Sequence, residues 1–310
     1  SCVVPMIRSG IIDYIVTTGA NLYHDLHHSL DLPLTQGTPF VNDNELFDKD
    51  IIRIYDIFMD YEVLAATDNW LMRTFSKSEF QKRMGTRELH YLVGKFADEV
   101  EQERGTIGKS FVAEAYRYEV PIYTSSPGDS TLGLDIAALN LIGKDICIDS
   151  SIDVNETAAL VLEAKQVGKS GVVVWGGGSP KNFILQPEPA LQEVLGFDIK
   201  GHDYFIQVTD ARPDTGGLSG ATPNEAVSWA KIDPDTVNQS VVCYSDATIV
   251  MPLLTAYLED CGIRREPKRL YRKIPKLLDK LREKFLEQED LILGKRSVAD
   301  TVKFLKGSKG

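Results

Sequence analysis

Short apolar runs that end in Gly, Ser, Thr or Asp recur along this chain of 310 residues. Apolar runs of this length, bounded by turn-forming residues, predict buried β-strands. We expect strands at residues 14–16, 120–124, 145–148, 171–175, 203–208 and 240–244. The pattern therefore predicts a sheet in which a row of polar turns faces a ligand.

A strand, a helix and a second strand follow one another between residues 145 and 175. Asp153 is the expected N-cap of the helix with Glu156 as its capping partner, and the helix should end near Gly168. A unit of this length predicts a right-handed crossover between two parallel strands of one sheet. Because ligands bind beyond the carboxyl ends of such strands, the glycine triplet at 176–178 is where a dinucleotide is expected to approach.

Helical spacing of apolar residues predicts largely helical structure at residues 48–103 and an apolar helix at 249–258. The composition then changes to a basic, Leu-punctuated segment at 264–285, which is typical of an amphipathic helix packed on a domain. We expect one catalytic domain at residues 1–262 and a basic helical extension at 263–310. No internal repeat is evident.

The formal charge of -11 argues against a surface that binds nucleic acid, which needs clustered Lys and Arg. A negative field does suit a cationic ligand such as a polyamine. The four cysteines form no C-x-x-C pair, so we expect neither a zinc site nor a disulfide framework. No apolar run approaches the roughly 20 residues that span a bilayer, and we expect a soluble, cytoplasmic protein without a membrane partner.

The densest set of chemically useful residues lies at 219–232, in the segment SGATPNEAVSWAKI. If the segment is helical after Pro223, Glu225 and Trp229 share one face, and Lys231 lies close to the indole. A Lys beside an aromatic wall and away from bulk water is easier to deprotonate, as an amine nucleophile requires, and a nearby Glu225 opposes that shift while being able to bind a substrate ammonium. Taken alone, one Lys after one Trp indicates a snorkelling surface residue.

This segment closely resembles the active-site segment of deoxyhypusine synthases, and further matching motifs occur in the family's order. They are Thr17-Thr18-Gly19, the turn with Asp129, Gly176-Gly177-Gly178, and Ser245-Asp246-Ala247 before Pro252-Leu253-Leu254. The resemblance implies an α/β protein with a Rossmann-like parallel sheet flanked by helices that binds NAD. It also implies a homotetramer in which neighbouring subunits complete each site.

By this resemblance the chain is a transferase that moves a 4-aminobutyl group from spermidine, or putrescine, to an acceptor amine that is a protein lysine or putrescine. Lys231 would carry the group as an enzyme imine, and Glu225, Trp229 and His24 would contact the substrate. The positions that match the family's NAD contacts are Thr18, Gly19, Ala20, Asp129, Gly178, Asp210, Ala211, Asp246 and Ala247.

Several pocket positions depart from the family pattern. His24 replaces a glutamate, Leu134 replaces a polyamine-binding aspartate with Asp135 one place off register, and Phe183 replaces a histidine. Two further acidic positions correspond to Thr215 and Leu218, with Asp214 displaced by one, and Ala20-Asn21 replaces two glycines. Each lost carboxylate removes a bond to a substrate ammonium worth about 1.5–3 kcal/mol. The substitutions favour a different substrate pair, as in the related homospermidine synthases, whose acceptor is putrescine.

Two other interpretations stay open. A family segment that precedes the first motif has no counterpart here, so an N-terminal part of the fold is expected to be missing and the chain is alternatively a catalytically silent NAD- or polyamine-binding homologue. His24 and His28 are spaced as one helical turn and suit a metal-dependent amine hydrolase. No third ligand with supporting spacing is visible, and we expect no metal.

Overall fold

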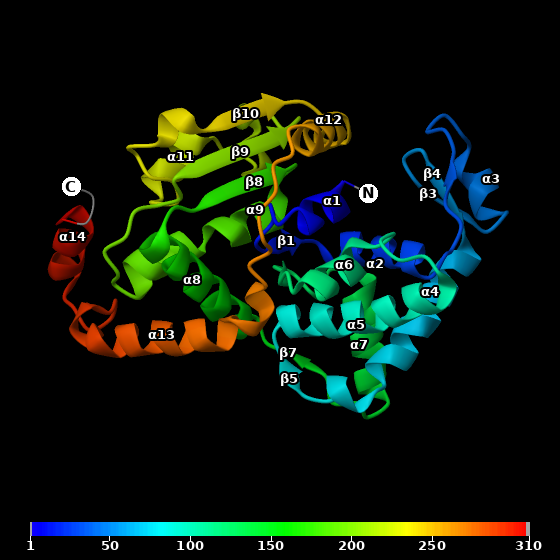
Figure 1. Ribbon diagram of the computed structural model, residues 1–310, viewed down its shortest axis with the longest axis horizontal. Coiled ribbons are helices and arrows are strands. Elements are labelled where there is room, and N and C mark those ends of the chain that lie inside the picture. Colours follow the sequence, from blue (N-terminus) through cyan, green and yellow to red (C-terminus); the bar gives the residue numbers. More distant parts are fainter. Residues whose placement is uncertain (1, 308–310) are drawn as a thin grey trace. The chain divides into compact units, whose positions relative to one another are not determined.

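The computed structural model describes residues 2–307, and its contacts divide the chain into two compact units (Figure 1). Unit 1 comprises Val3–Asp149 together with Arg264–Arg269, and unit 2 comprises Ser150–Ile263 and the chain from Leu270 onward. Parallel strand pairs flanked by helices occur in both units, so the mixed α/β class expected from the sequence is confirmed.

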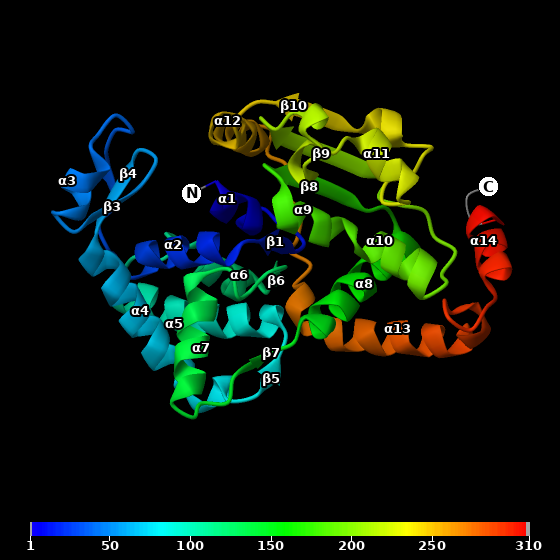
Figure 2. The ribbon, with the colours of Figure 1, turned by 180° about the vertical axis from the view of Figure 1, so that it is seen from behind.

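Unit 1 is built mainly of helices packed around one apolar core, which includes Leu26, Leu71 and Phe75 (Figure 2). Its helices are α1 (Val3–Arg8), α2 (Gly19–Ser29), α3 (Asp43–Phe47), α4 (Tyr61–Phe75), α5 (Thr86–Arg104), α6 (Phe111–Tyr118) and α7 (Thr131–Leu141). Two parallel pairs join β1 (Ile15–Thr17) to β6 (Ile122–Thr124) and β5 (Arg83–Met84) to β7 (Cys147–Ile148).

The expectation of largely helical structure at residues 48–103 is wrong at the start of this range. The structure has an antiparallel sheet there, in which β4 (Ile57–Asp60) pairs with β3 (Ile51–Ile54) and with β2 (Thr35–Gln36). The apolar residues of this segment also fit the alternation of two short strands, and Tyr55 between them takes a left-handed φ of 53° that a helix does not contain.

Unit 2 contains a three-stranded parallel sheet in the order β10 (Val241–Tyr244), β9 (Tyr204–Thr209), β8 (Gly171–Trp175) (Figure 1). Val172, Val174 and Phe205 lie on its buried face. The helices are α8 (Ser150–Val167), α9 (Gly178–Leu185), α10 (Pro187–Pro189), α11 (Pro223–Ser228), α12 (Ala247–Asp260), α13 (Ile274–Glu287) and α14 (Val298–Gly307). The apolar side of the basic helix α13 packs on α8, as the pattern predicts. The α-helix expected at 264–285 begins only at Ile274, and Arg264–Arg269 form a non-helical segment of unit 1.

Two details of the expected crossover at residues 145–175 are wrong. The strand at its start, β7, pairs with β5, whereas the strand at its end, β8, pairs with β9, so the two strands belong to different sheets. Sequence spacing predicts a helix between two strands but does not identify the partner of each strand. The helix also begins at Ser150, which places Asp153 inside its first turn and not at its cap.

Candidate functional site

Lys231 lies just beyond α11, in a segment whose backbone is held on several sides. The Thr222 hydroxyl caps this helix by accepting from the Glu225 amide at 3.2 Å. Ala230 then takes a left-handed φ of 56°, and its carbonyl accepts from the Gln192 amide at 2.9 Å. The Lys231 carbonyl accepts from the backbone amide of His202 at 3.0 Å. The left-handed backbone of Ala230 and the two bonded carbonyls hold the backbone of Lys231 in one conformation, and this sets the direction in which its side chain leaves the chain.

The Lys231 side chain is half-buried and has a neutral hydrogen-bond partner. Its Nζ donates to Asn182 Oδ1 at 3.0 Å and lies 5.9 Å from the centre of the Trp229 ring, as the sequence predicts. Burial lowers the pKa of Lys231, and the nearby Glu225 carboxylate opposes the shift. The lysine therefore has a larger neutral, nucleophilic fraction than a lysine in water. Glu225 and most of the Trp229 ring are exposed beside it.

Lys181 is a second lysine of this site, which the sequence analysis did not identify. It is only 5% exposed, and its Nζ donates to Gln207 Oε1 at 2.9 Å and to the Ala221 carbonyl at 2.7 Å. Burial lowers its pKa to about 8, Glu225 raises it, and repulsion from Lys231 lowers it further. The only signal for it in the sequence is its place shortly after the glycine triplet, which does not reveal burial.

The predicted cofactor residues of unit 2 lie at the carboxyl ends of its three parallel strands. Gly178 follows β8, and the others follow β9 and β10 in the pairs Asp210-Ala211 and Asp246-Ala247. Because these strands are parallel neighbours, the three turns line one edge of the sheet. The Asp246 carboxylate accepts from the Thr248 amide at 2.7 Å and caps α12, and this bonding lowers the pKa of Asp246.

The glycine triplet has the backbone conformation that makes glycine necessary. Gly176 and Gly178 have φ values of 80° and 71°, and the space beside their Cα atoms is open. A Cβ on Gly177 would instead lie 2.5 Å from the Cα of Ser219. The turn is therefore packed against the loop that precedes α11 and leaves its other side open to a ligand.

The predicted cofactor residues of unit 1 lie at the carboxyl ends of its parallel pair β1 and β6. Thr18 caps α2, which begins at Gly19 and Ala20, and Asp129 lies in the exposed turn before α7. The Ser130 side chain packs so closely on Gly19 that a Cβ there would lie 2.2 Å from Ser130 Oγ. These residues are thus neighbours within unit 1.

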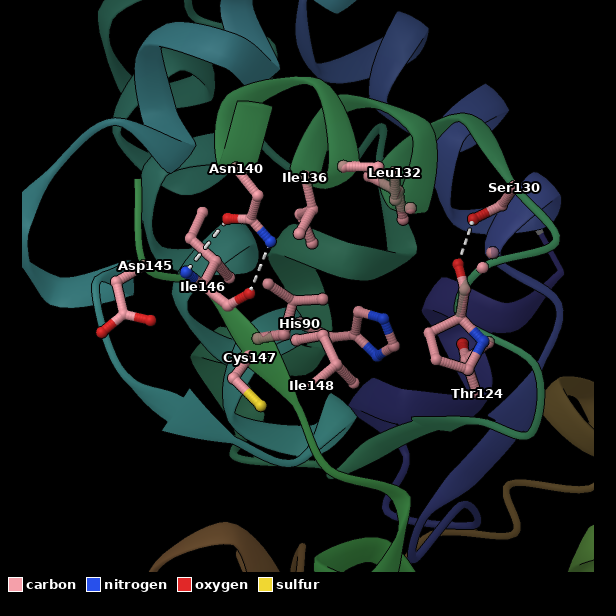
Figure 3. Close-up of a pocket in the computed structure, with 16 residues that line it drawn as sticks. His90, Thr124, Ser130, Leu132, Ile136, Asn140, Asp145, Ile146, Cys147 and Ile148 are labelled. Atoms are coloured by element: carbon pink, nitrogen blue, oxygen red, sulfur yellow. Dashed lines mark hydrogen bonds between the residues drawn. The ribbon is translucent and has the colours of Figure 1, made fainter. Parts of the chain in front are cut away.

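A cavity of about 470 Å³ opens beside Gly19 in unit 1 (Figure 3). Its walls are mostly apolar, and Asn140 fixes one wall by bonding both the amide and the carbonyl of Ile146. His90 Nδ1 lies 2.9 Å from the Ile122 carbonyl, and burial lowers the pKa of His90 to about 4, so this ring is neutral. Gly19 is the one predicted cofactor residue among those that line the cavity.

His24 and His28 do not act together as the metal-site hypothesis requires. His28 is exposed, whereas His24 Nδ1 lies 3.1 Å from Nε2 of the buried His27. Asp25 accepts from the backbone amides of Phe111 and Val112 at the start of α6. In residues 2–307 no group of three or more His, Cys, Asp and Glu side chains is placed to hold a metal ion. Within the same range no helix is both long and apolar enough to cross a bilayer.

The carboxylates that are displaced by one residue from the family's acidic positions have different surroundings. Asp214 forms two bonds to the Arg212 guanidinium, from Nε at 2.9 Å and from Nη2 at 2.5 Å. Asp135 is buried, and its Oδ2 has no hydrogen-bond partner among the described residues. Burial, with a smaller contribution from Asp68, raises the pKa of Asp135 to about 7.

Comparisons with known proteins identify the family of this sequence. The family model described as deoxyhypusine synthase matches residues 1–258. The chain is 54% identical to the "Deoxyhypusine synthase-like protein" of Nostoc punctiforme over 287 residues, covering 92% of this chain and 74% of the relative. It is 40% identical to the "Probable deoxyhypusine synthase 2" of Methanosarcina acetivorans over 255 residues, 82% of this chain and 71% of the relative.

A solved structure shares the fold at low sequence identity. A crystal structure assigned to a deoxyhypusine synthase of Entamoeba histolytica superimposes with a TM-score of 0.52 at 16% identity, over 86% of this chain and 72% of that one. The family model covers most of the sequence, and the relatives are similar over most of their own length. The chain belongs to the deoxyhypusine synthase family.

Proposed function

We propose that this chain is an NAD-dependent transferase that moves a 4-aminobutyl group from spermidine to an acceptor amine, with Lys231 carrying the group. The observation that carries the proposal is the state of this lysine: half-buried, bonded to a neutral amide oxygen and with a lowered pKa. An amine must be unprotonated to attack an imine carbon. Membership of the deoxyhypusine synthase family supplies the reaction class.

The residues at the sheet edge of unit 2 fit a dinucleotide. No atom lies within 4 Å of the position of a Cβ at Gly176 or Gly178, so a cofactor can come close to the backbone there. Helix α9 begins at Gly178 and can direct its backbone amides at a phosphate. Asp210 and Asp246 lie at the ends of the next two strands, where a carboxylate can bind ribose hydroxyls. When bound, NAD supplies the removal of a hydride from the donor amine and its later return to the product.

The chain's own groups would act on the amine substrate. Lys231 Nζ forms a bond to the imine carbon of the oxidised donor while 1,3-diaminopropane leaves, and the resulting enzyme imine passes the four-carbon fragment to the acceptor. Glu225 lies where it can bind a substrate ammonium, and the Trp229 ring shields one side of Lys231. Asn182 holds the lysine amine in place until it reacts.

The changed pocket leads us to propose an acceptor other than a protein lysine, with putrescine as the first candidate. Phe183 and Leu134 offer no carboxylate to an ammonium group, and Asp214 is already paired with Arg212. A pocket with fewer carboxylates binds a smaller number of cationic groups. Labelled spermidine incubated with and without putrescine distinguishes the two acceptors by the product formed.

The decisive experiment is chemical trapping. The protein is incubated with NAD and spermidine, reduced with borohydride, digested and analysed by mass spectrometry. A four-carbon adduct on Lys231 is expected. Product formation with an unmodified Lys231 would overturn the assignment of this residue. Tight NAD binding without adduct or product from any amine pair would identify a silent homologue instead.

A further inference from the structure

The cavity of about 470 Å³ in unit 1 is lined by residues of that unit alone. Its volume lies in the range that small-molecule sites have in proteins. Most of its wall is apolar, with Leu132 and Ile136 on α7 and Ile146 and Ile148 at β7. The cavity shares only Gly19 with the residues that we assign to NAD.

His90 places a free lone pair on the wall of this cavity. His90 Nδ1 lies 2.9 Å from the Ile122 carbonyl, and because a carbonyl oxygen only accepts, Nδ1 must carry a proton. Burial lowers the pKa of His90 to about 4, so the ring is neutral near pH 7 and has a single N–H. Nε2 is therefore an acceptor, and it forms no hydrogen bond within residues 2–307. Figure 3 shows this ring in the midst of the lining side chains.

The hydroxyl group of Thr124 is a second polar group on the same wall. Thr124 is 3% exposed, and its Oγ1 has no hydrogen-bond partner among the described residues. Buried polar atoms in proteins nearly always have a partner. Two unpartnered polar groups on the wall of one cavity therefore indicate a place for the polar group of a ligand.

Helix α5 fixes both of these groups through β6. Thr86 and His90 lie one helical turn apart, so both side chains face the same way. The Thr86 hydroxyl accepts from the Thr124 amide at 3.0 Å, and the His90 ring donates to the Ile122 carbonyl. The two polar groups are thus held in position by bonds within unit 1, which reduces the entropic cost of binding a ligand to them.

The wall lacks the charges that phosphates or a polyamine would need. The described residues that line the cavity include no Lys or Arg, and the one carboxylate among them is that of the exposed Asp145. Figure 3 shows this carboxylate directed away from the other lining side chains. Because a charged group that is buried without a counter-charge is strongly unfavourable, the interior suits an uncharged ligand.

We propose that this cavity is a binding site for an uncharged, mainly apolar nitrogen heterocycle that donates its N–H to His90 Nε2. The flat faces of such a ring can pack on the aliphatic side chains of the wall, and its N–H is a donor without a charge. The Thr124 hydroxyl offers a second hydrogen bond to a ligand that also carries an acceptor. The site uses no residue of the segment around Lys231, so the inference does not depend on the proposed transfer reaction.

The first test compares two probes of nearly the same shape. Indole has a ring N–H, whereas indene has a CH₂ group in its place. In ligand-detected NMR titrations at pH 7, indole should bind the unmodified protein about tenfold more tightly than indene, because only indole satisfies the buried acceptor of His90. Equal affinities, or undetectable binding of indole, would overturn the proposal.

The second test removes the acceptor. His90→Phe keeps an aromatic ring and should bind indole and indene equally well, while His28→Ala, which changes an exposed histidine, should keep the preference for indole. A preference that persists in a folded His90→Phe variant would exclude His90 as the acceptor. If circular dichroism shows that this variant is unfolded, the unmodified protein decides: the ¹⁵N signal of His90 Nε2 should shift with indole and not with indene.

The part of Thr124 is tested with indazole, which has a ring acceptor next to its N–H. Indazole should bind the unmodified protein severalfold more tightly than indole. In Thr124→Val, which keeps the shape of the side chain without the hydroxyl, the two probes should bind equally. An equal affinity for both probes in the unmodified protein would exclude Thr124 from the site.

Two cysteines show where the probe binds. Cys147 lies on the wall of the cavity, and Cys261 is exposed in unit 2. Saturating indole should slow the alkylation of Cys147 by iodoacetamide and leave that of Cys261 unchanged, as measured by peptide mass spectrometry. Binding without protection of Cys147 would place the probe elsewhere and overturn the proposal. Displacement of indole by saturating NAD would also overturn it, because the cavity would then belong to the cofactor site.

Discussion

A glycine packed against a serine occurs in each unit at the end of a parallel strand, yet the two glycines are needed for different reasons. In unit 1 a Cβ on Gly19 would lie 2.2 Å from Ser130 Oγ, and in unit 2 a Cβ on Gly177 would lie 2.5 Å from Ser219 Cα. Gly19 begins an ordinary helix, so only the lack of space requires glycine there. Gly177 has a neighbour with positive φ on each side, so that turn needs glycine for its backbone as well.

The two turns also differ in the kind of titratable group that lies near them. Unit 2 has two amines whose pKa values burial lowers, Lys181 and Lys231. Unit 1 has neutral imidazoles, and a buried carboxyl group, Asp135, whose pKa burial raises. The turn of unit 2 thus lies beside two amines, whereas the turn of unit 1 lies beside imidazoles and a carboxyl group.

The largest effect is expected for Lys231→Arg. A guanidinium stays protonated and has no free lone pair, so the trapped adduct and product formation should fall by a factor on the order of a thousand or more. The variant should remain folded because the long side chain is retained. Lys169→Arg, a change of an exposed lysine in the same unit, serves as the control. An adduct on Lys181 in the variant would show that Lys181 can also act as the nucleophile.

Gly177→Ala should be more harmful than Gly19→Ala. The new methyl group in Gly177→Ala meets backbone, which must move, and we expect a loss of up to about 3 kcal/mol in the free energy of unfolding. At Gly19 the methyl group meets side chains and no backbone, those of Ser130 and Leu132, and the loss should be smaller. Denaturant titrations of both variants measure the difference. Equal losses would show that the two glycine–serine contacts are equivalent.

Glu188→Gln and Asp135→Asn compare the effects of the buried carboxyl groups in the two units on the pH dependence of stability. Glu188 is fully buried, and its burial raises its pKa to about 8. Because the pKa of Glu188 is higher in the folded than in the unfolded protein, its protonated form stabilises the fold. This stabilisation is complete at a pH below the unfolded pKa and is lost as the pH rises toward 8. Between pH 6.5 and 9 the unmodified protein should therefore lose about 2 kcal/mol that Glu188→Gln does not lose.

The choice of pH range separates Glu188 from its neighbour His202, whose Nδ1 lies 3.4 Å from Glu188 Oε1. Burial lowers the pKa of His202 to about 4, so its contribution is lost only as the pH falls below 6.5. Asp135→Asn should give a smaller change than Glu188→Gln, because the pKa of Asp135 is raised only to about 7. A larger change for Asp135→Asn would reverse the comparison between the units.

Local patterns in the sequence predicted the edge of the sheet well but not the pairing of strands. The run at Gly171–Trp175 is apolar and bounded by turn residues, and it forms β8 with those limits. The hairpin of β3 and β4 was missed because the spacing of its apolar residues also fits a helix. The pairing of β7 with β5 depends on contacts between distant segments, which no local pattern records.

The candidate site was predictable where a motif carries the chemistry. Lys231, its contact with Trp229 and the opposing effect of Glu225 all follow from the order of residues in one short segment. Lys181 and His90 were missed because their importance comes from burial and from partners far along the chain. A lone lysine or histidine has no distinctive spacing, so only the folded structure shows its role.

Gly178→Ala should have a small effect on stability, so it can show whether this turn contributes to NAD binding. The Cβ would meet no atom within 4 Å, but the φ of 71° should cost about 1 kcal/mol for an L-residue. Gly168→Ala, which adds a methyl group in equally open space without a positive φ, is the matched control and should cost less.

If NAD binds at the open side of the turn with Gly178, the methyl group of Gly178→Ala occupies space that the cofactor needs. NAD affinity, measured by calorimetry, should then fall by more than the loss of stability explains. An unchanged NAD affinity would mean that the cofactor does not approach at Gly178, however strongly the strand ends suggest it.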